Sequence, residues 1–407
     1  MANPLADKTI ILGVTGSIAA YKSAELASKL TQAGARVHVI LTPAAEKFIS
    51  PLTFQSVTGN KAYTDADLWG GEGHVVHVSI GRSADLVVVA PISANTMAKL
   101  AYGLADNLLT VTVLAAACPL VIAPAMDAGM FSRVSTQTNV EILKARGVTF
   151  IGPTSGHLAS GLEGLGRMTE PTEIASQIRF LLSRKGPLQG FKIVVTAGGT
   201  QEAIDPVRMI SNRSSGKQGY ALAQAALDAG AEVVLITAPS ALNPPAGVQA
   251  MYVQSAEEMH KAVIEQIKDS AALIMAAAVA DFKPSTQSTK KLKKESGIPV
   301  LEFEQTQDIL KSVYEKKKSM NPELKVIGFA AETDDLITNA IKKVASKHLD
   351  MIVANDVTDP QAGFAVDTNR VTLIYSDGST EPLPLLGKDQ VAEKIIQTIT
   401  SWLRAEG

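Results

Sequence analysis

Residues 9–42 read TIILGVTGSIAAYKSAELASKLTQAGARVHVILT, and this stretch contains a complete strand–helix–strand unit. Residues 9–14 form a nearly continuous apolar run, which is typical of a buried strand, and a glycine–serine turn follows. Residues 18–33 have helical periodicity, a glycine ends the helix, and residues 36–42 form the next strand. Apolar strands that alternate with helices predict an α/β fold with a parallel sheet covered on both faces.

The same pattern restarts in the second half of the chain. LASKLTQAGARVHVILTP, from Leu26, resembles LAQAALDAGAEVVLITAP, from Leu222, and two independent units that obey the same packing rules explain this more simply than duplication. The length of 407 residues suggests two domains or three. A polar segment with glycine and proline, SRKGPLQG, divides the halves, so we expect two doubly wound parallel-sheet domains, 1–185 and 190–407. Further apolar runs predict strands at 85–90, 120–123, 191–197, 232–237, 272–275, 326–329 and 351–354, a hairpin from 370, and helices at 217–229 and 395–403.

Composition excludes several classes of protein. The chain is 46% hydrophobic, which is enough to form buried cores. Its 38 Lys and Arg residues balance 40 Asp and Glu residues, so the chain lacks the excess of positive charge that is typical of nucleic-acid-binding proteins. A single cysteine allows no intramolecular disulfide and no Cys-based zinc site. The N-terminus lacks the pattern of a secretory signal, and the apolar runs are too short to span a membrane. We therefore expect a soluble cytoplasmic protein that acts on small molecules, without nucleic-acid or membrane partners.

The first strand ends in the turn GVTGSIAAYK, residues 13–22. Glycines and a serine at the start of a helix present backbone N–H groups to a phosphate. The motif is not GxGxxG, and the second strand ends in Thr42 rather than an acidic residue. Both features argue against NAD and favour a monophosphate such as FMN, although a glycine turn can also serve packing alone.

Three other segments of the first half could carry chemistry. Ser93 and Asn95 follow the strand that ends near residue 90, where ligands bind in open α/β sheets, but either could be an ordinary helix cap. Of His74 and His77, His77 is the better candidate for acid–base catalysis, because it precedes an apolar stretch that leads to a strand. A structural role is the alternative. Residues 154–168 are rich in glycine and could form either a lid or a plain surface loop.

The second half contains two segments with anion-binding character. Residues 197–219, AGGTQEAIDPVRMISNRSSGKQG, combine glycines, charged residues and a helix start, but Gln218 after Lys217 excludes a Walker A loop. Residues 275–294, MAAAVADFKPSTQSTKKLKK, place small side chains after a strand, where a base or ribose could approach. The lysines at 290, 291, 293 and 294 could equally be a solvated face.

Together these motifs resemble the family of bifunctional coenzyme A biosynthesis proteins over essentially the whole chain. The family fuses a phosphopantothenoylcysteine decarboxylase to a phosphopantothenate–cysteine ligase. The resemblance rests on GVTGSIAAYK, HVSIGRSADLVVVAP, SANTMAKLAYGLADNLLT and PAMDAGM in the first half, and on TAGGTQEAIDPVRMISNRSSGKQG, AAAVADF, KLKK, GFAAET and ANDV in the second. No single motif is decisive, but their order and spacing are specific.

For the first half, the resemblance implies a flavodoxin-like decarboxylase domain that uses FMN. In the family, the flavin oxidises the substrate thiol so that CO₂ can leave, and the resulting ene-thiol is then reduced to 4′-phosphopantetheine. His77 matches the active-site histidine, and Asp127 and Ser160 occupy two further catalytic positions. The expected FMN contacts are Gly16, Ser17, Ile18, Thr42, Ser93 and Asn95.

For the second half, the resemblance implies a Rossmann-like ligase that joins 4′-phosphopantothenate to cysteine through an acyl-cytidylate, with CTP and Mg²⁺. Asn212 matches the asparagine that supports this intermediate, and Arg208 and Lys291 are expected to take part. The expected CTP contacts are Met275, Ala276, Ala277, Asp281, Lys291, Gln307, Asp308, Ile309, Leu310, Phe329, Lys343 and Lys347. Mg²⁺ would bind through the CTP phosphates, and the family assembles into homo-oligomers.

Two residues depart from the family pattern. Asp127 stands where the family has asparagine, and Ser160 stands where it has a lid cysteine, which can protonate the ene-thiol. Because carboxylates repel, Asp127 should either be protonated, with a raised pKa, or weaken substrate binding. Cys118 reads as a small buried residue rather than a replacement donor. Two alternatives follow: an active ligase with an impaired or altered flavin half, or a flavin-binding regulatory subunit.

Overall fold

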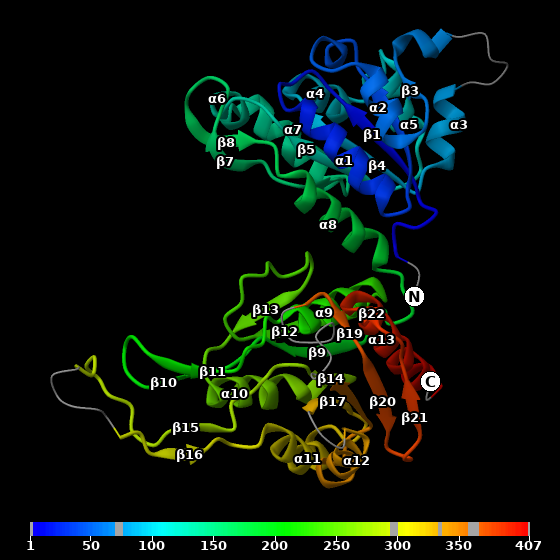
Figure 1. The fold of residues 1–407 in the computed structure, drawn as a ribbon. Helices are drawn as coiled ribbons and strands as arrows, with labels where there is room; N and C mark the ends of the chain where they lie inside the picture. The colour runs from blue at the N-terminus through cyan, green and yellow to red at the C-terminus, as the bar shows by residue number, and fades with distance from the viewer. Residues whose placement is uncertain (1–2, 70–75, 294–299, 333–335, 357–365, 406–407) are drawn as a thin grey trace. The chain divides into compact units, whose positions relative to one another are not determined.

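The structure is a computed structural model that describes residues 3–69, 76–293, 300–332, 336–356 and 366–405. The chain divides into two compact units, residues 2–182 and residues 183–407 (Figure 1). Each unit has its own main sheet, with two hydrophobic core clusters described in the first unit and one in the second. Within the described ranges, none of the helices combines the length and apolar character that a membrane span requires.

The first unit is built on a parallel sheet with the order β3-β2-β1-β4-β5-β6. Without the short β3, the order of the strands is the flavodoxin-like 2-1-3-4-5, which confirms the predicted fold class. The order reverses between β1 and β4, so this is the switch point where ligands bind in such sheets. The strands are β1 (Thr9–Val14), β2 (Arg36–Leu41), β3 (Ala62–Tyr63), β4 (Leu86–Ile92), β5 (Leu120–Pro124) and β6 (Thr149–Phe150).

Helices cover both faces of this sheet. Ile10 and Leu12 of β1 belong to one core cluster, and Ile11, which points the other way, belongs to the other. Burial on both faces is the reason that the strands read as continuous apolar runs. The helices are α1 (Ala20–Gln32), α2 (Pro51–Thr58), α3 (Val76–Ser83), α4 (Ala94–Tyr102), α5 (Leu108–Ala115), α6 (Ala128–Ser132), α7 (Val134–Ala145) and α8 (Pro171–Ser183), with short 3₁₀ turns at Ala45–Lys47 and Asp65–Trp69.

The glycine-rich segment 154–168 forms an antiparallel hairpin of β7 (Thr154–His157) and β8 (Glu163–Arg167). The sequence left a lid and a surface loop open as alternatives, and it did not predict these strands. Helix α1 starts two residues later than predicted, because the chain first makes a turn in which Ala20 N donates to Ser17 O at 3.0 Å.

The second unit repeats the doubly wound design. Its sheet has the order β13-β12-β9-β14-β17-β18-β20-β21, and the last two strands are antiparallel, which confirms the predicted C-terminal hairpin. The six parallel strands have the Rossmann order 3-2-1-4-5-6, with the switch point between β9 and β14. The strands are β9 (Lys192–Ala197), β12 (Glu232–Thr237), β13 (Gln249–Tyr252), β14 (Ala272–Met275), β17 (Lys325–Glu332), β18 (Met351–Asp356), β20 (Val371–Tyr375) and β21 (Thr380–Pro382).

Helix α9 lies directly on β9. A Cβ atom at Gly219 would be 2.5 Å from the Cβ of Ala197, so only glycine allows this approach, and it brings the start of α9 to the carboxyl edge of the sheet. Helix α13 packs against α9. The helices are α9 (Lys217–Asp228), α10 (Ala256–Gln266), α11 (Ile309–Met320), α12 (Leu336–Lys347) and α13 (Lys388–Ala405), with a 3₁₀ turn at Ile267–Asp269. Small two-stranded sheets pair β10 (Gln201–Ala203) with β11 (Met209–Ser211), β15 (Phe282–Pro284) with β16 (Phe303–Gln305), and β19 (Thr368–Asn369) with β22 (Leu386–Gly387).

Candidate active sites

In the first unit, the turns after three strands are bonded to one another at the carboxyl edge of the sheet. Thr15 Oγ1 donates to Pro91 O at 2.9 Å and accepts from Ser93 N at 2.9 Å, which joins the turns after β1 and β4. Thr42 N donates to Val14 O at 3.1 Å, which adds the turn after β2. The three segments predicted to contact a flavin therefore meet at the switch point.

Two of these turns lie unusually close together. A Cβ atom at Gly16 would be 2.6 Å from the Cβ of Ala44, so the turn after β1 needs glycine here. Ser93 is the N-cap of α4, and its side chain accepts from Thr96 N at 3.3 Å. Ser93 therefore caps this helix, and Asn95 lies in its first turn.

His77 lies in the first turn of α3. Its Nδ1 atom is buried, and it has no hydrogen-bond partner among the residues that the structure describes. A buried polar nitrogen without a partner is unfavourable, so this atom is available to bind a substrate or cofactor group. His38 and His260 also have a buried ring nitrogen without a partner among the described residues, so the place of His77 in the sequence motif remains the reason to single it out.

Asp127 and Ser160 form a hydrogen bond beside the carboxyl edge of the first unit's sheet. Ala125 N donates to Ile92 O at 3.1 Å, which fixes the start of the turn at the end of β4. Asp127 Oδ2 accepts from Ser160 Oγ at 2.7 Å, and Oδ1 accepts from Gly129 N at 2.8 Å. These two hydrogen bonds hold the pKa of Asp127 below its ordinary value, and the bond from Ser160 has the larger effect. Without a substrate carboxylate beside it, Asp127 is therefore ionised, and the predicted choice between a raised pKa and weaker substrate binding concerns the complex with substrate.

Cys118 is half-buried rather than fully buried, and it packs against one of the two cores of the first unit. Burial raises the pKa of its thiol above the ordinary value. A thiol that is held neutral in this way fits the predicted structural role.

In the second unit, a pocket of about 900 Å³ opens at the carboxyl edge of the sheet. Met275 ends β14, and Phe329 and Ile352 come from β17 and β18. Most residues that the resemblance assigned to CTP line this one pocket, although they come from separate segments: Met275, Ala276, Ala277, Asp281, Gln307, Asp308, Ile309, Leu310, Phe329, Lys343 and Lys347.

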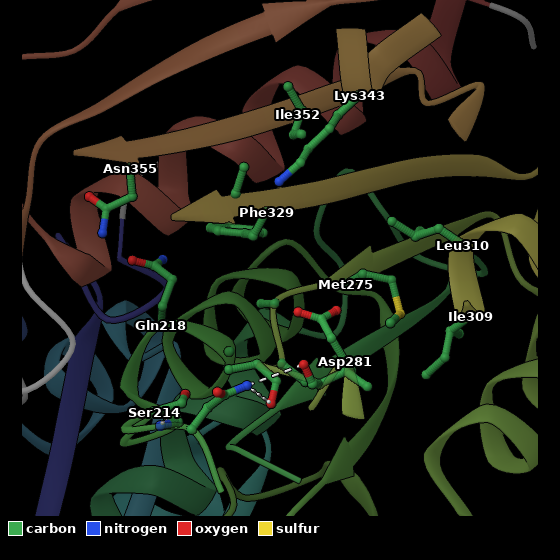
Figure 2. A pocket seen from close by; sticks show the side chains of 18 of the residues that line it. Ser214, Gln218, Met275, Asp281, Ile309, Leu310, Phe329, Lys343, Ile352 and Asn355 are labelled. Carbon is green, nitrogen blue, oxygen red and sulfur yellow. Dashed lines mark hydrogen bonds between the residues drawn. The ribbon is translucent and has the colours of Figure 1, made fainter. Parts of the chain in front are cut away.

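Figure 2 shows how these side chains surround the space. Lys343 and Phe329 project from one side, and Asp281 projects from the opposite side. Ile309 and Leu310 lie together at one end. The pocket thus offers an aromatic ring and small side chains to a flat ligand, and a lysine to a negatively charged group.

Cationic side chains outnumber acidic ones in the pocket. Lys347 pairs with Asp308, the residue that caps α11, and this pair connects the end of α12 to the start of α11. Lys388 is buried and donates to Val366 O at 2.5 Å. Burial, and then the charge of Lys217, lower the pKa of Lys388. The lining cations are Arg213, Lys217, Lys343, Lys347 and Lys388, against Asp281 and Asp308, so the pocket favours an anion.

Asn212 braces the wall of this pocket. Its side-chain nitrogen donates to Ala278 O and to Val279 O, each at 3.2 Å. Gly216 follows with φ of 79° and begins α9. The start of this helix therefore presents backbone N–H groups to the pocket, as the anion-site prediction required.

Arg208 and Lys291 are not among the residues that line the pocket. Arg208 pairs with the buried Asp205 at 2.6 Å and donates to Leu292 O at 2.6 Å. Burial would raise the pKa of Asp205, but hydrogen bonds from Val207 N, the Arg208 side chain and Leu292 N outweigh it and leave this pKa far below its ordinary value. The ion pair thus joins the loop of Arg208 to the lysine segment, whose Lys294 lies outside the described residues.

The pocket also contains residues that sequence reasoning did not assign to it. Asn369 donates to Gln218 Oε1 at 2.9 Å, and Gln218 donates to Lys388 O at 3.1 Å, so α9 and the start of α13 close one end together. Of these residues, only Gln218 could have been assigned to the pocket from the sequence, because it directly follows the SSGK turn. Among the described residues, no group of three His, Cys, Asp or Glu side chains could hold a metal ion.

Both units match known families. Residues 2–183 match the family described as Flavoprotein, and residues 188–403 match the DNA/pantothenate metabolism flavoprotein C-terminal domain. The chain is 45% identical over 406 residues to the coenzyme A biosynthesis bifunctional protein CoaBC of Bacillus subtilis, with 99% of each covered. The chain belongs to this family. CoaBC of Vibrio cholerae is 41% identical over 397 residues, covering 97% of this chain and 98% of the relative. A crystal structure of the C-terminal domain of a CoaBC is 42% identical, with a TM-score of 0.47, and covers 54% of this chain and 100% of that domain.

As a member of the CoaBC family, the chain is a bifunctional enzyme of coenzyme A biosynthesis. Its flavoprotein half is the phosphopantothenoylcysteine decarboxylase, and its C-terminal half is the phosphopantothenate–cysteine ligase. Full-length similarity to bifunctional relatives does not favour the alternative of a regulatory subunit.

Proposed function

We propose that the pocket of the second unit binds CTP and forms an acyl-cytidylate of 4′-phosphopantothenate. One observation supports this proposal: four separate segments line the same cationic pocket. They are the residues after β14, the residues before α11, strand β17 and helix α12. Lysines and helix N–H groups are suited to a triphosphate and to the pyrophosphate that departs. The small residues after β14 leave room for a ribose or a base.

The ligase chemistry then follows from charge and position. Mg²⁺ would bind mainly to the phosphates, because the described residues provide no cluster of metal ligands. The substrate carboxylate attacks the α-phosphorus of CTP, pyrophosphate leaves, and the cysteine amine attacks the activated carbonyl and releases CMP. Asn212 holds residues 278 and 279 in place beside this reaction. Arg208 and Lys291 lie on neighbouring loops, and we propose that they act on the substrates rather than on the base.

We propose that the first unit binds FMN at its switch point. The residues fit such a ligand, because the turn after β1 is a close-packed glycine cradle and the buried Nδ1 atom of His77 has no partner among the described residues. When bound, the flavin supplies the electron transfers that make decarboxylation possible. Gly16, Ser17 and Ile18 would hold its phosphate, and Thr42, Ser93 and Asn95 would hold the remainder.

The two halves act on consecutive compounds. The ligase product is the substrate of the decarboxylase, which yields 4′-phosphopantetheine and CO₂. His77 is the proposed acid–base residue of the second reaction. A homo-oligomer and a cytoplasmic location remain predictions from the sequence.

Calorimetric titration of the whole protein tests the nucleotide site. We expect CTP to bind more tightly than ATP, and Lys343→Ala to weaken CTP binding about tenfold, as for one lost charged contact. Lys342→Ala is the matched control, because this lysine lies on the same helix but does not line the pocket. If CTP and ATP bind equally tightly, the pocket is not specific for CTP. If Lys343→Ala binds CTP as tightly as the wild type does, the nucleotide does not bind in this pocket.

A further inference from the structure

The tip of the β7–β8 hairpin is fastened to the turn that follows β5. Ser160, in the tip, donates to Asp127 in the turn at 2.7 Å. Met126 N, one residue earlier, donates to Gly166 O of β8 at 3.0 Å. The hairpin is thus held to one turn both at its tip and along its outgoing strand.

Glycines in β8 make this contact unusually close. A Cβ atom at Gly166 would be 2.2 Å from Met126 O, and one at Gly164 would be 2.7 Å from the Cβ of Ala128. The hairpin backbone therefore lies directly on the turn, and any side chain at either position would force it away. Since the turn is also bonded to the end of β4, the contact lies at the edge of the sheet where we place the flavin.

The polarity of the bond between Asp127 and Ser160 is fixed by chemistry. A carboxylate only accepts hydrogen bonds, and Asp127 accepts one on each oxygen, from Gly129 N and from Ser160 Oγ. A serine hydroxyl has a single proton to donate. The proton of Ser160 is therefore committed to Asp127 and does not point to a substrate.

We propose that Asp127 and Ser160 are a pair of positioning residues that hold the hairpin over the flavin edge, and that Ser160 is not the acid that protonates the reacting carbon. The proposal rests on the decarboxylase role of the first unit. It assigns that proton to another group or to water, because the pair, once bonded, has none to give.

The charge of Asp127 supports this assignment. The depressed pKa of Asp127 means that the carboxyl group carries no proton near neutral pH. An asparagine at this position would reverse the bond: its oxygen could still cap α6 through Gly129 N, while its NH₂ group would face Ser160 Oγ and release the hydroxyl proton. The aspartate therefore determines what Ser160 can do.

Ser160→Ala in the flavin-loaded protein separates positioning from acid catalysis. If Ser160 positions the hairpin, KM for phosphopantothenoylcysteine rises about tenfold, as for one lost hydrogen bond to a charged group, and the ratio of saturated product to ene-thiol stays at the wild-type value. Hydrogen exchange of the amides of residues 158–166 should quicken at the same time. Ser155→Ala is the matched control, because its exposed hydroxyl lies in the same hairpin and makes no hydrogen bond to a described residue.

A second variant keeps the test decisive. Asp127→Asn preserves a contact of reversed polarity, so hydrogen exchange of the hairpin should change less than in Ser160→Ala. A fall in the ratio of saturated product to ene-thiol in Ser160→Ala, with KM unchanged, would make Ser160 the acid and overturn the proposal. Exchange in Ser160→Ala no faster than in Ser155→Ala would overturn it as well. Loss of decarboxylation in the wild type would instead refute the function of the unit, while the exchange data would still test the pair.

Discussion

Asn212→Asp is the sharpest perturbation of the ligase site. The substitution replaces the nitrogen that donates to Ala278 O and Val279 O with a carboxylate oxygen, so two hydrogen bonds of 3.2 Å become two repulsions. Each lost bond is worth about 1 kcal/mol, and together they amount to about 2 kcal/mol. If the loss falls on the reactive arrangement of the pocket, kcat/KM of the ligase decreases about 30-fold, since 1.4 kcal/mol corresponds to tenfold.

The chain offers a matched control for this variant. Asn321, which ends α11, donates from its side-chain nitrogen to Ile267 O at 2.8 Å and to Ser270 O at 2.7 Å, and it does not line the pocket. Asn321→Asp should therefore lower stability without lowering ligase turnover. Because the chain has two tryptophans, a Trp69→Phe background leaves Trp402 alone to report urea unfolding of the second unit.

The assay is initial-rate release of CMP by the whole protein, measured with each substrate varied in turn. The expected pattern is a loss of turnover in Asn212→Asp with a small change in stability, and the reverse in Asn321→Asp. Wild-type turnover in Asn212→Asp, or an equal loss in Asn321→Asp, would refute the role given to Asn212.

Three further outcomes are expected. Gly216→Ala should weaken CTP binding about fivefold, because its φ of 79° is strained for alanine and a Cβ atom would lie 3.3 Å from a neighbouring side chain, whereas Gly378→Ala, with φ of 83° and open space, should leave calorimetric binding unchanged. Ser17→Glu should reduce flavin occupancy in the visible spectrum of purified protein, since a carboxylate repels the phosphate. Full occupancy would argue against a phosphate site at Ser17. Because the pKa of Asp127 is depressed in the folded protein, its contribution to stability is present above the unfolded value and is lost only as pH falls through the folded one. Decarboxylation should therefore show no titration of Asp127 between pH 6 and 8, and a step in that range that Asp127→Asn removes would contradict this.

The positions of the buried strands could be predicted from the sequence, although β17 (Lys325–Glu332) is twice as long as the predicted 326–329. The structure gives β12 and β14 the predicted bounds, because apolar runs flanked by turn residues identify strands that are buried on both faces. The start of α13 was missed: Lys388 and the polar residues after it give little periodic signal, and α13 begins there because it packs on α9. The small hairpins, such as β15–β16, were missed because their side chains are largely exposed and carry no alternating apolar pattern.

For the sites, the sequence identified residues at strand ends but not the bonds between distant segments. The hydrogen bond between Asp127 and Ser160 joins positions 33 residues apart, through a hairpin that the sequence did not predict. The position of Lys388 in the pocket depends in the same way on how α13 packs. The anchoring of the Arg208 loop to Leu292 through a buried aspartate also arises only from the tertiary fold.

We expect a CTP-driven ligase in the second unit to supply the decarboxylase in the first. The most direct test incubates the whole protein with 4′-phosphopantothenate, CTP, Mg²⁺ and cysteine labelled with ¹³C in its carboxyl group, and measures ¹³CO₂ against CMP. We expect ¹³CO₂ to appear only with CTP and to approach one molecule for each CMP formed. Release of ¹³CO₂ that does not require CTP, or CMP formed without ¹³CO₂, would contradict it.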